Sequence, residues 1–265
     1  MIDIDALFEG YFRKFIAQNT GKYNDSQLEN KVGEIYENFG NTPIKELGNV
    51  SPRDYFKRMK DDELVAALKE CVNGGVSVSD YLCDELTGRK GCFDGLVSLI
   101  DVSNDELSTY CVNTVRFNPR VKEAYPILLS ALTDKNCRES LAEVITEVLS
   151  DGADCVKDEI LNAYGDCVYA QKYLVEILSK CTIDDRVTEL LVCEFKNHKK
   201  EYSLYAGYLA KYGDDRALGA LYESLKGEKL PYLDYKEIQI AIEALGGEVK
   251  SEVDYSADKV YKKLH

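Results

Sequence analysis

Two stretches thirty residues apart have similar sequences, with five of fifteen positions identical: DDRVTELLVCEFKNH at 184–198 and DDRALGALYESLKGE at 214–228. In the first, Val187, Leu190, Leu191 and Phe195 follow the i, i+3, i+4, i+8 spacing of one helix face. Apolar residues fill the same positions in the second stretch. Because one amphipathic helix pair cannot bury its apolar face alone, the repeated sequence predicts helix pairs that stack and bury one another's apolar faces.

Each copy begins with an acidic pair directly after another helix-periodic segment. An aspartate at the N-cap accepts the free amide protons of the first turn, so Asp184 and Asp214 are predicted N-caps. Gly213 is predicted to end the preceding helix in the left-handed conformation. Looser copies of the layout lie on either side, at 141–161 and 238–248. The chain is therefore expected to repeat one helix–turn–helix unit.

The stretch YAGYLAKYGDDRALGALYESL at 205–225, followed by IQIAIEALGGE at 238–248, resembles HEAT-like repeats of the bilin-lyase type. Such units read roughly A-x-x-L-x-x-x-G-D-x-x-A-x-x-x-L. The residues that fit are Ala206, Leu209, Gly213, Asp214, Ala217 and Leu221, with Ala241, Ala244, Leu245 and Gly246 opening the next unit. The basic residue that these repeats usually carry early in the helix of Ala241 is replaced by Ile238 and Gln239. Over about residues 138–250, the resemblance implies a right-handed α-solenoid and, in most members, protein–protein interaction.

Helical periodicity covers nearly the whole chain, and no segment alternates as a strand does. We expect an all-α, right-handed superhelix of HEAT-like pairs in one continuous domain. Residues 1–60 form a divergent N-terminal cap segment, and residues 61–265 form repeats that end in a capping helix. Capping boxes are predicted at Ser51, Ser77 and Ser103. Helices are expected at 3–18, 25–38, 52–58, 61–73, 79–87, 92–100, 104–115, 120–132, 138–150, 154–164, 168–181, 185–197, 200–212, 215–226, 233–245 and 254–264.

The net charge of −14 is unevenly placed, because residues 61–183 carry 22 acidic against 11 basic side chains. Such a field repels phosphate backbones and argues against nucleic acid as a partner. It favours a basic protein or peptide, and the alternative is that surface acidity serves solubility. No apolar run approaches the roughly 18 residues of a membrane helix, and the start MIDIDALFEG is not a signal peptide. We expect no membrane association and a cytoplasmic protein.

Signatures of catalysis are few. Di-iron hydroxylases of helical-repeat architecture need His-Glu steps, and alkylpurine DNA glycosylases need Trp and a basic groove. This chain has no His-Glu step and no Trp, and its net charge is negative. It also lacks a Gly-x-Gly-x-x-Gly loop. With only His198 and His265 as histidines, neither a metal site nor a cofactor is expected. The nine cysteines show no close pairing and are expected to be reduced and mostly buried, and acidic pairs such as Asp61-Asp62 are interpreted as helix caps.

Tyrosine is abundant, at 19 residues. Tyr202, Tyr205 and Tyr212 share a helix sector, and tyrosine supplies rigid amphipathic area that is enriched at interfaces. The alternative is that these rings pack between repeats. On the second helices of the pairs, at 185–197 and 215–226, further binding positions are predicted to lie exposed on a concave side: Glu189, Glu194, Tyr222 and Glu223.

The sequence thus predicts a non-catalytic scaffold or adaptor that binds a protein or peptide partner on an acidic, tyrosine-bearing surface. The alternative is an enzyme, or a lyase- or chaperone-type subunit of the bilin-lyase HEAT class, whose active-site residues cannot be recognised from the sequence.

Overall fold

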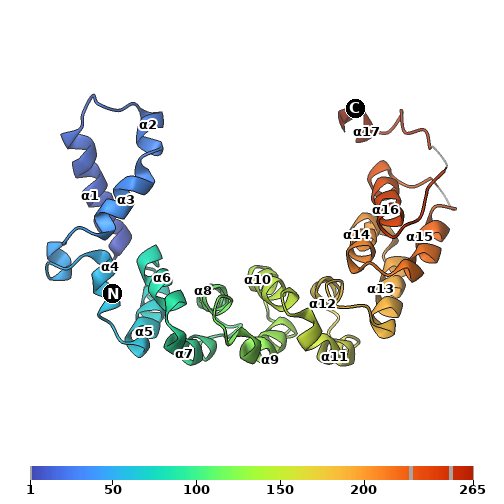
Figure 1. Cartoon of the computed structure of the whole chain (residues 1–265), viewed down its shortest axis with the longest axis horizontal. Coiled ribbons are helices and arrows are strands. Elements are labelled where there is room, and N and C mark those ends of the chain that lie inside the picture. Colours follow the sequence, from blue (N-terminus) through green and yellow to red (C-terminus); the bar gives the residue numbers. More distant parts are fainter. Residues whose placement is uncertain (1, 227–228, 251–252, 265) are drawn as a thin grey trace. The chain divides into compact units, whose positions relative to one another are not determined.

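The computed structural model describes residues 2–226, 229–250 and 253–264 (Figure 1). Over these residues the chain forms seventeen α-helices and four short 3-10 helices, and its β structure is limited to an isolated bridge between Ile44 and Val50. The all-α class predicted from helical periodicity is confirmed. Within the same ranges, every helix is too short or too polar to span a bilayer.

The chain divides into two compact units. The first comprises the residues up to Ile127 together with Asn136–Val144, and the second comprises Leu128–Lys135 together with the residues from Ile145 on. Two helices, α9 (Val121–Leu132) and α10 (Glu139–Ser150), contribute residues to both units. The other helices belong to one unit each.

The first unit contains the N-terminal helices. They are α1 (Ile4–Gln18), α2 (Asp25–Glu29), α3 (Val32–Gly40), α4 (Pro52–Lys57), α5 (Asp61–Asn73), α6 (Asp80–Gly88), α7 (Phe93–Val97) and α8 (Asp105–Val115). An aromatic cluster joins α1, α3 and α6. In it the Phe8 and Tyr36 rings meet edge to face with centroids 4.9 Å apart, and Tyr36 stacks on Tyr81 at 4.8 Å. Such pairs stabilise the fold beyond the area they bury.

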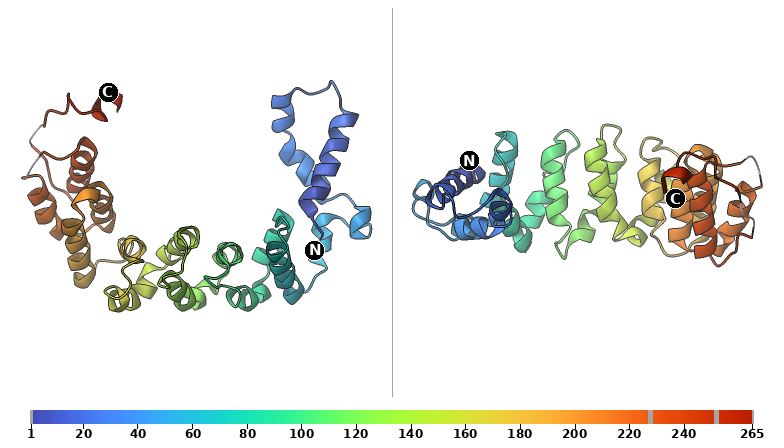
Figure 2. Two further views of the ribbon diagram at one scale, coloured as in Figure 1. Left: turned by 180° about the vertical axis from the view of Figure 1, so that it is seen from behind. Right: turned by 90° about the horizontal axis from the view of Figure 1, so that it is seen from above.

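The second unit contains the C-terminal helices, which Figure 2 shows from two further directions. They are α11 (Ala153–Ala163), α12 (Gln171–Leu178), α13 (Asp185–Asn197), α14 (Tyr202–Tyr212), α15 (Leu218–Ser224), α16 (Tyr232–Ala244) and α17 (Tyr261–Leu264). α14 packs along α16, burying Ala206, Leu209, Ile238 and Ala241 completely or nearly so. α13 packs against both α14 and α15.

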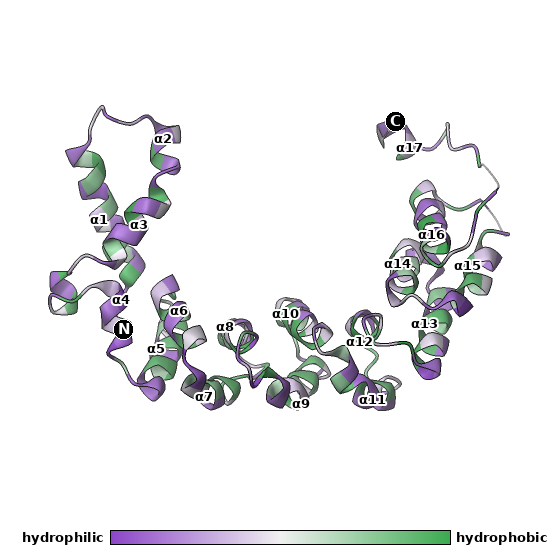
Figure 3. Cartoon of the chain, viewed as in Figure 1, coloured by the Kyte–Doolittle hydropathy of each residue, from purple (hydrophilic) through white to green (hydrophobic). Residues whose placement is uncertain are grey.

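Most helices carry a hydrophobic and a hydrophilic face, and Figure 3 shows both kinds of residue around single helices. On α13, Val187, Leu191 and Phe195 recur every four residues and are at most 1% exposed. The spacing of apolar residues in the repeated sequence therefore identifies the buried face of α13.

The helix ends near the starts of the two repeated stretches, 184–198 and 214–228, are as predicted. Asp184 and Asp214 are N-caps, and each carboxylate accepts the backbone N–H of the arginine two residues on. Gly213 ends α14 with a φ of 81°, and Gly246 follows α16 with a φ of 84°. Glycine adopts this left-handed conformation without steric cost.

Bonds between arginine and aspartate join alternate helices at a regular interval. In the first unit Arg89 contacts Asp61 and Arg120 contacts Asp94, at 3.4 and 2.8 Å, over 28 and 26 residues. In the second unit Arg186 contacts Asp158 and Arg216 contacts Asp185, at 2.8 and 2.6 Å, over 28 and 31 residues. Each aspartate lies on an odd-numbered helix, α5, α7, α11 or α13. Each arginine lies within four residues of the start of the next odd-numbered helix, and Arg89 is also the C-cap residue of α6.

Several expected helix boundaries need correction. The helix expected at 25–38 is split into α2 and α3, and the one expected at 215–226 begins as a 3-10 turn over Asp215–Ala217. The closing helix expected at 254–264 is reduced to α17, because the Asp254 and Asp258 carboxylates bind the backbone N–H groups two residues on and form turns. Gly227 and Glu228, at the end of the second copy, lie outside the described residues.

Two of the three predicted capping boxes are also misplaced. Ser51 caps α4 as expected, exchanging bonds with Asp54. The N-cap of α6 is Ser79 rather than Ser77, and the N-cap of α8 is Asn104 rather than Ser103. Ser77 instead donates a hydrogen bond to Asp5 on α1.

Candidate functional site

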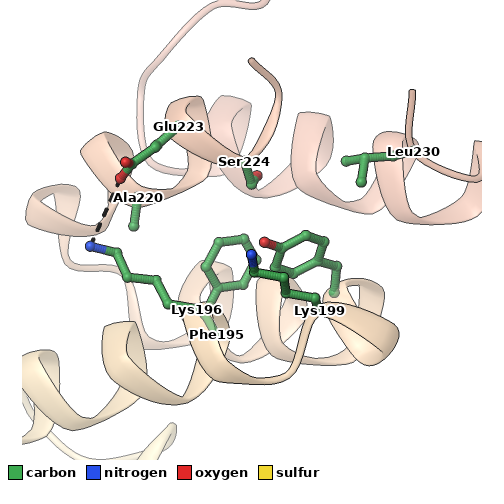
Figure 4. A pocket seen from close by; sticks show the side chains of 8 residues that line it. Phe195, Lys196, Lys199, Ala220, Glu223, Ser224 and Leu230 are labelled. Carbon is green, nitrogen blue, oxygen red and sulfur yellow. Dashed lines mark ion pairs between the residues drawn. The ribbon is translucent and has the colours of Figure 1, made fainter. Parts of the chain in front are cut away.

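The second unit carries a groove of about 580 Å³ between the C-terminal half of α13 and α15. Its walls come from the end of α13, the short 3-10 turn Lys199–Glu201, the start of α14, and α15 with the segment that follows it (Figure 4). The lining residues are Phe195, Lys196, Lys199, Tyr202, Ala220, Glu223, Ser224 and Leu230. We call this the α13–α15 groove.

The floor of the α13–α15 groove is apolar. Phe195 and Tyr202 stack with ring centroids 4.7 Å apart and planes 29° apart. Both rings are largely buried, and Ala220 on α15 is 7% exposed. Because the small Ala220 side chain faces two large rings across the helix pair, space remains between the helices.

The rim of the α13–α15 groove is charged. Lys196 Nζ lies 3.9 Å from Glu223 Oε2, and both side chains are more than half exposed, so the pair contributes little stability (Figure 4). Lys199 is exposed and has no ion-pair partner within the described part of the chain. Burial, and after it the Glu223 carboxylate, raise the pKa of the Tyr202 hydroxyl. The rim therefore presents both signs of charge around an aromatic floor.

Two of the seven residues predicted to bind a partner, Tyr202 and Glu223, lie in the α13–α15 groove. Tyr222 is next to it, and its hydroxyl bonds the backbone N–H and C=O of Glu248 at 3.0 and 3.1 Å. Glu189 is exposed on α13, outside the groove lining.

The other three predicted residues have little exposed surface. Tyr205 and Tyr212 are about 5% exposed, and Tyr212 uses its hydroxyl to bond the backbone N–H and C=O of Asp184. The Glu194 side chain is only 12% exposed. All three are held between helices, so they offer little surface to a partner. Tyr202 is nearly as buried, at 8% exposed, so it contributes only a small accessible area to the α13–α15 groove.

Glu194 belongs to a second cluster that sequence reasoning missed. Its Oε2 atom is buried and lies 3.3 Å from Nδ1 of His198, whose ring stacks on Tyr205 at 4.5 Å. The Tyr164 hydroxyl is also buried, with no hydrogen-bond partner among the described residues. Burial, and next the Glu194 carboxylate, raise the pKa of Tyr164. A largely buried carboxylate and phenol thus accompany a partly exposed imidazole, a combination that could exchange protons.

The cysteines depart in part from expectation. None of the nine, all of which lie within the described residues, forms a disulfide, but only four are buried, namely Cys71, Cys92, Cys111 and Cys181, whereas Cys155 and Cys193 are exposed. Over the described ranges, no three His, Cys, Asp or Glu side chains are grouped so as to hold a metal ion.

Comparison of the chain with protein-family models, with curated protein sequences and with solved structures gives no match.

Proposed function

We propose that the protein is a non-catalytic scaffold or adaptor that binds a segment of a partner protein in the α13–α15 groove. The observation that carries the proposal is the pairing of a stacked Phe195–Tyr202 floor with a charged, solvent-exposed rim. Only a small part of this floor is exposed in the free protein, and an apolar centre inside a polar rim is the usual anatomy of protein interfaces. An apolar side chain of the partner is expected to rest on the floor between Ala220 and Leu230.

The charge of the whole chain favours a basic partner. At −14, with most of the excess in residues 61–183, the protein attracts a positively charged molecule from a distance and accelerates its association. The proposal places the protein in the cytoplasm, where nine free thiols remain reduced.

For the architecture we propose a HEAT-like, right-handed α-solenoid. The support is four arginine–aspartate bonds that each span 26 to 31 residues and link one helix pair to the next, as expected for stacked pairs. Small-angle X-ray scattering tests this, because a compact globule of this length has a radius of gyration of about 18 Å. A solenoid gives a clearly larger value, and a measured value near that of the globule contradicts the proposal.

Site-specific photo-crosslinking tests the binding function. A benzoylphenylalanine at Ser224, in the α13–α15 groove, is expected to crosslink one protein reproducibly in native lysate. The same probe at Glu189, which is exposed on α13 outside the groove lining, is the matched control. Adding Ala220→Arg, which fills the floor, is expected to abolish the crosslink while the helical circular dichroism is kept. Equal crosslinking from both probes, or no loss with Ala220→Arg, contradicts the proposal.

The alternative of an enzyme, or of a lyase- or chaperone-type subunit, is favoured by one observation, the partly buried Tyr164–Glu194–His198 cluster. Native mass spectrometry of the purified chain distinguishes the two functions. A small molecule that co-purifies with the wild type and is lost with Glu194→Gln supports the alternative. A mass equal to that of the bare chain in both proteins supports the scaffold.

A further inference from the structure

The first unit carries a cavity of its own, of about 410 Å³, bounded by α1, α3 and the segment that leads into α6. Its lining combines acidic, aromatic and aliphatic side chains from these three places: Asp5, Phe8, Val32, Tyr36, Val78 and Asp80. We call it the Asp5–Asp80 cavity. It is separate from the α13–α15 groove and does not depend on the function proposed for that groove.

Two aromatic rings form one wall of the Asp5–Asp80 cavity. Phe8 and Tyr36 meet edge to face at 4.9 Å, and Tyr36 is fixed from behind by stacking on Tyr81. Both lining rings are only partly buried, so they keep some surface free for a ligand. The face of an aromatic ring is negative, and it attracts a cation.

Two carboxylates add to this negative field. Asp5 accepts a hydrogen bond from Ser77 Oγ, and no lysine or arginine pairs with Asp5 or Asp80 among the residues that the structure describes. Burial is the main reason that the pKa of Tyr36 is raised, and Tyr81, Asp80 and Asp5 raise it further.

The first unit already uses this combination to hold arginine. The Arg120 guanidinium lies 4.6 Å from the centre of the Phe93 ring and forms two bonds with Asp94, at 2.8 and 2.9 Å. Arg53 lies 5.3 Å from the Tyr81 ring centre and pairs with Glu37. In both places a flat guanidinium covers a ring and turns its N–H groups to a carboxylate, which a lysine ammonium does less well.

We propose that the Asp5–Asp80 cavity binds an arginine side chain presented by a basic peptide segment of another protein. The guanidinium lies against Phe8 and Tyr36 and donates hydrogen bonds to Asp5 and Asp80. The aliphatic part of the side chain contacts Val32 and Val78.

A titration of the full-length, ¹⁵N-labelled chain with N-acetyl-L-arginine amide tests the proposal. We expect saturable amide shifts centred on Asp5, Phe8, Tyr36 and Asp80. N-acetyl-L-citrulline amide has the same shape without the charge and is expected to bind about tenfold more weakly. Equal binding of the citrulline probe, or shifts centred elsewhere, overturns the proposal. Equal or tighter binding of N-acetyl-L-lysine amide overturns the assignment to arginine.

Variants locate the site. Asp5→Asn and Asp80→Asn are each expected to weaken arginine binding about three- to tenfold, and Phe8→Leu about threefold. Glu29→Gln removes one exposed negative charge from α2 outside the cavity and is expected to change the affinity less than about twofold. Variants that all behave like Glu29→Gln overturn the proposal. If one aspartate variant fails to fold, the other variant and the citrulline comparison on the wild type still decide the question.

Discussion

Asp214 is the carboxylate on which the turn between α14 and α15 depends. It is 4% exposed, accepts a hydrogen bond from Thr188 Oγ1 at 2.5 Å, and pairs with the Arg216 guanidinium. The Arg216 hydrogen bonds are the main reason that the pKa of Asp214 is lowered to about 2. A buried carboxylate held in this way stabilises the fold only while it is ionised.

The first prediction concerns the pH dependence that follows from Asp214. Its folded-state pKa lies below the ordinary value of 3.8, so its contribution is present above about pH 5 and is lost as the pH falls toward 2. We expect Asp214→Asn to reduce the free energy of unfolding at pH 7 by about 1–3 kcal/mol. Between pH 4 and pH 2.5 the variant is expected to lose less stability than the wild type. Urea unfolding at several pH values measures both effects, and parallel pH profiles contradict the prediction.

The second prediction concerns the cysteines. Burial raises the pKa of Cys92 to about 11 and those of Cys111 and Cys181 to about 12, so these thiols hold little reactive thiolate near neutral pH. We expect iodoacetamide at pH 8 to modify the exposed Cys155 and Cys193 at least about tenfold faster. Peptide mass spectrometry over time gives the order. Early modification of Cys111 in the folded protein contradicts the prediction.

At the scale of helices, much could be predicted from the sequence. Apolar spacing identified nearly every helix, and α5 and α13 begin and end where the spacing predicted. Errors occur where a side-chain hydrogen bond, local or long-range, competes with the expected helix or cap. Asp254 and Asp258 bind nearby amides, so the closing helix shortens to one turn. Ser77 bonds Asp5, 72 residues away, so it does not cap α6. Such long-range partners leave no signal in the local pattern.

The α13–α15 groove could be predicted only in part. Tyr202 and Glu223 follow from residue type and helix position. Lys196 and Lys199 were missed because a run of charges at a helix end is usually solvated. Leu230 was missed because the path of the segment after α15 cannot be read from periodicity. Glu194 was misassigned as exposed, because the ring of Tyr205 and the imidazole of His198 pack on that side of α13.

The third prediction compares two equivalent arginines of the helix pairs. Arg216 bonds Asp185 and Thr188 and neutralises the buried Asp214, whereas Arg186 bonds Asp158 and the more exposed Asp184. We expect Arg216→Ala to cost about 2–3 kcal/mol, because it leaves a buried carboxylate without its partner. Arg186→Ala is expected to cost less than about 1 kcal/mol. Equilibrium urea unfolding measures both, and equal losses contradict the prediction.

At the scale of the whole molecule, charge is the dominant property. The chain carries 47 acidic and 33 basic side chains, so it repels itself at neutral pH. Most of its ion pairs have at least one well-exposed partner and contribute little individually. Screening by salt should therefore weaken the repulsion between like charges more than it weakens the attraction within the ion pairs.

The fourth prediction follows from this balance. Raising NaCl from about 0.05 to 0.5 M, which shortens the screening length well below 10 Å, is expected to raise the Tm by about 1–4 °C. Differential scanning fluorimetry measures the shift, and choline chloride serves as a control for specific binding of sodium. A Tm that falls with both salts means that the ion pairs outweigh the net repulsion.

The chain passes between its two compact units three times, after Ile127, after Lys135 and after Val144. Two of these passages lie inside the continuous helices α9 and α10. A chain cut anywhere from 127 to 145 therefore breaks a helix or leaves one core short of residues that the other fragment retains. Recombination between related genes within residues 127–145 would also break a helix or leave a core incomplete, so this stretch is expected to be inherited as a whole. Chimaeras of related chains should therefore fold only when their junctions lie outside it.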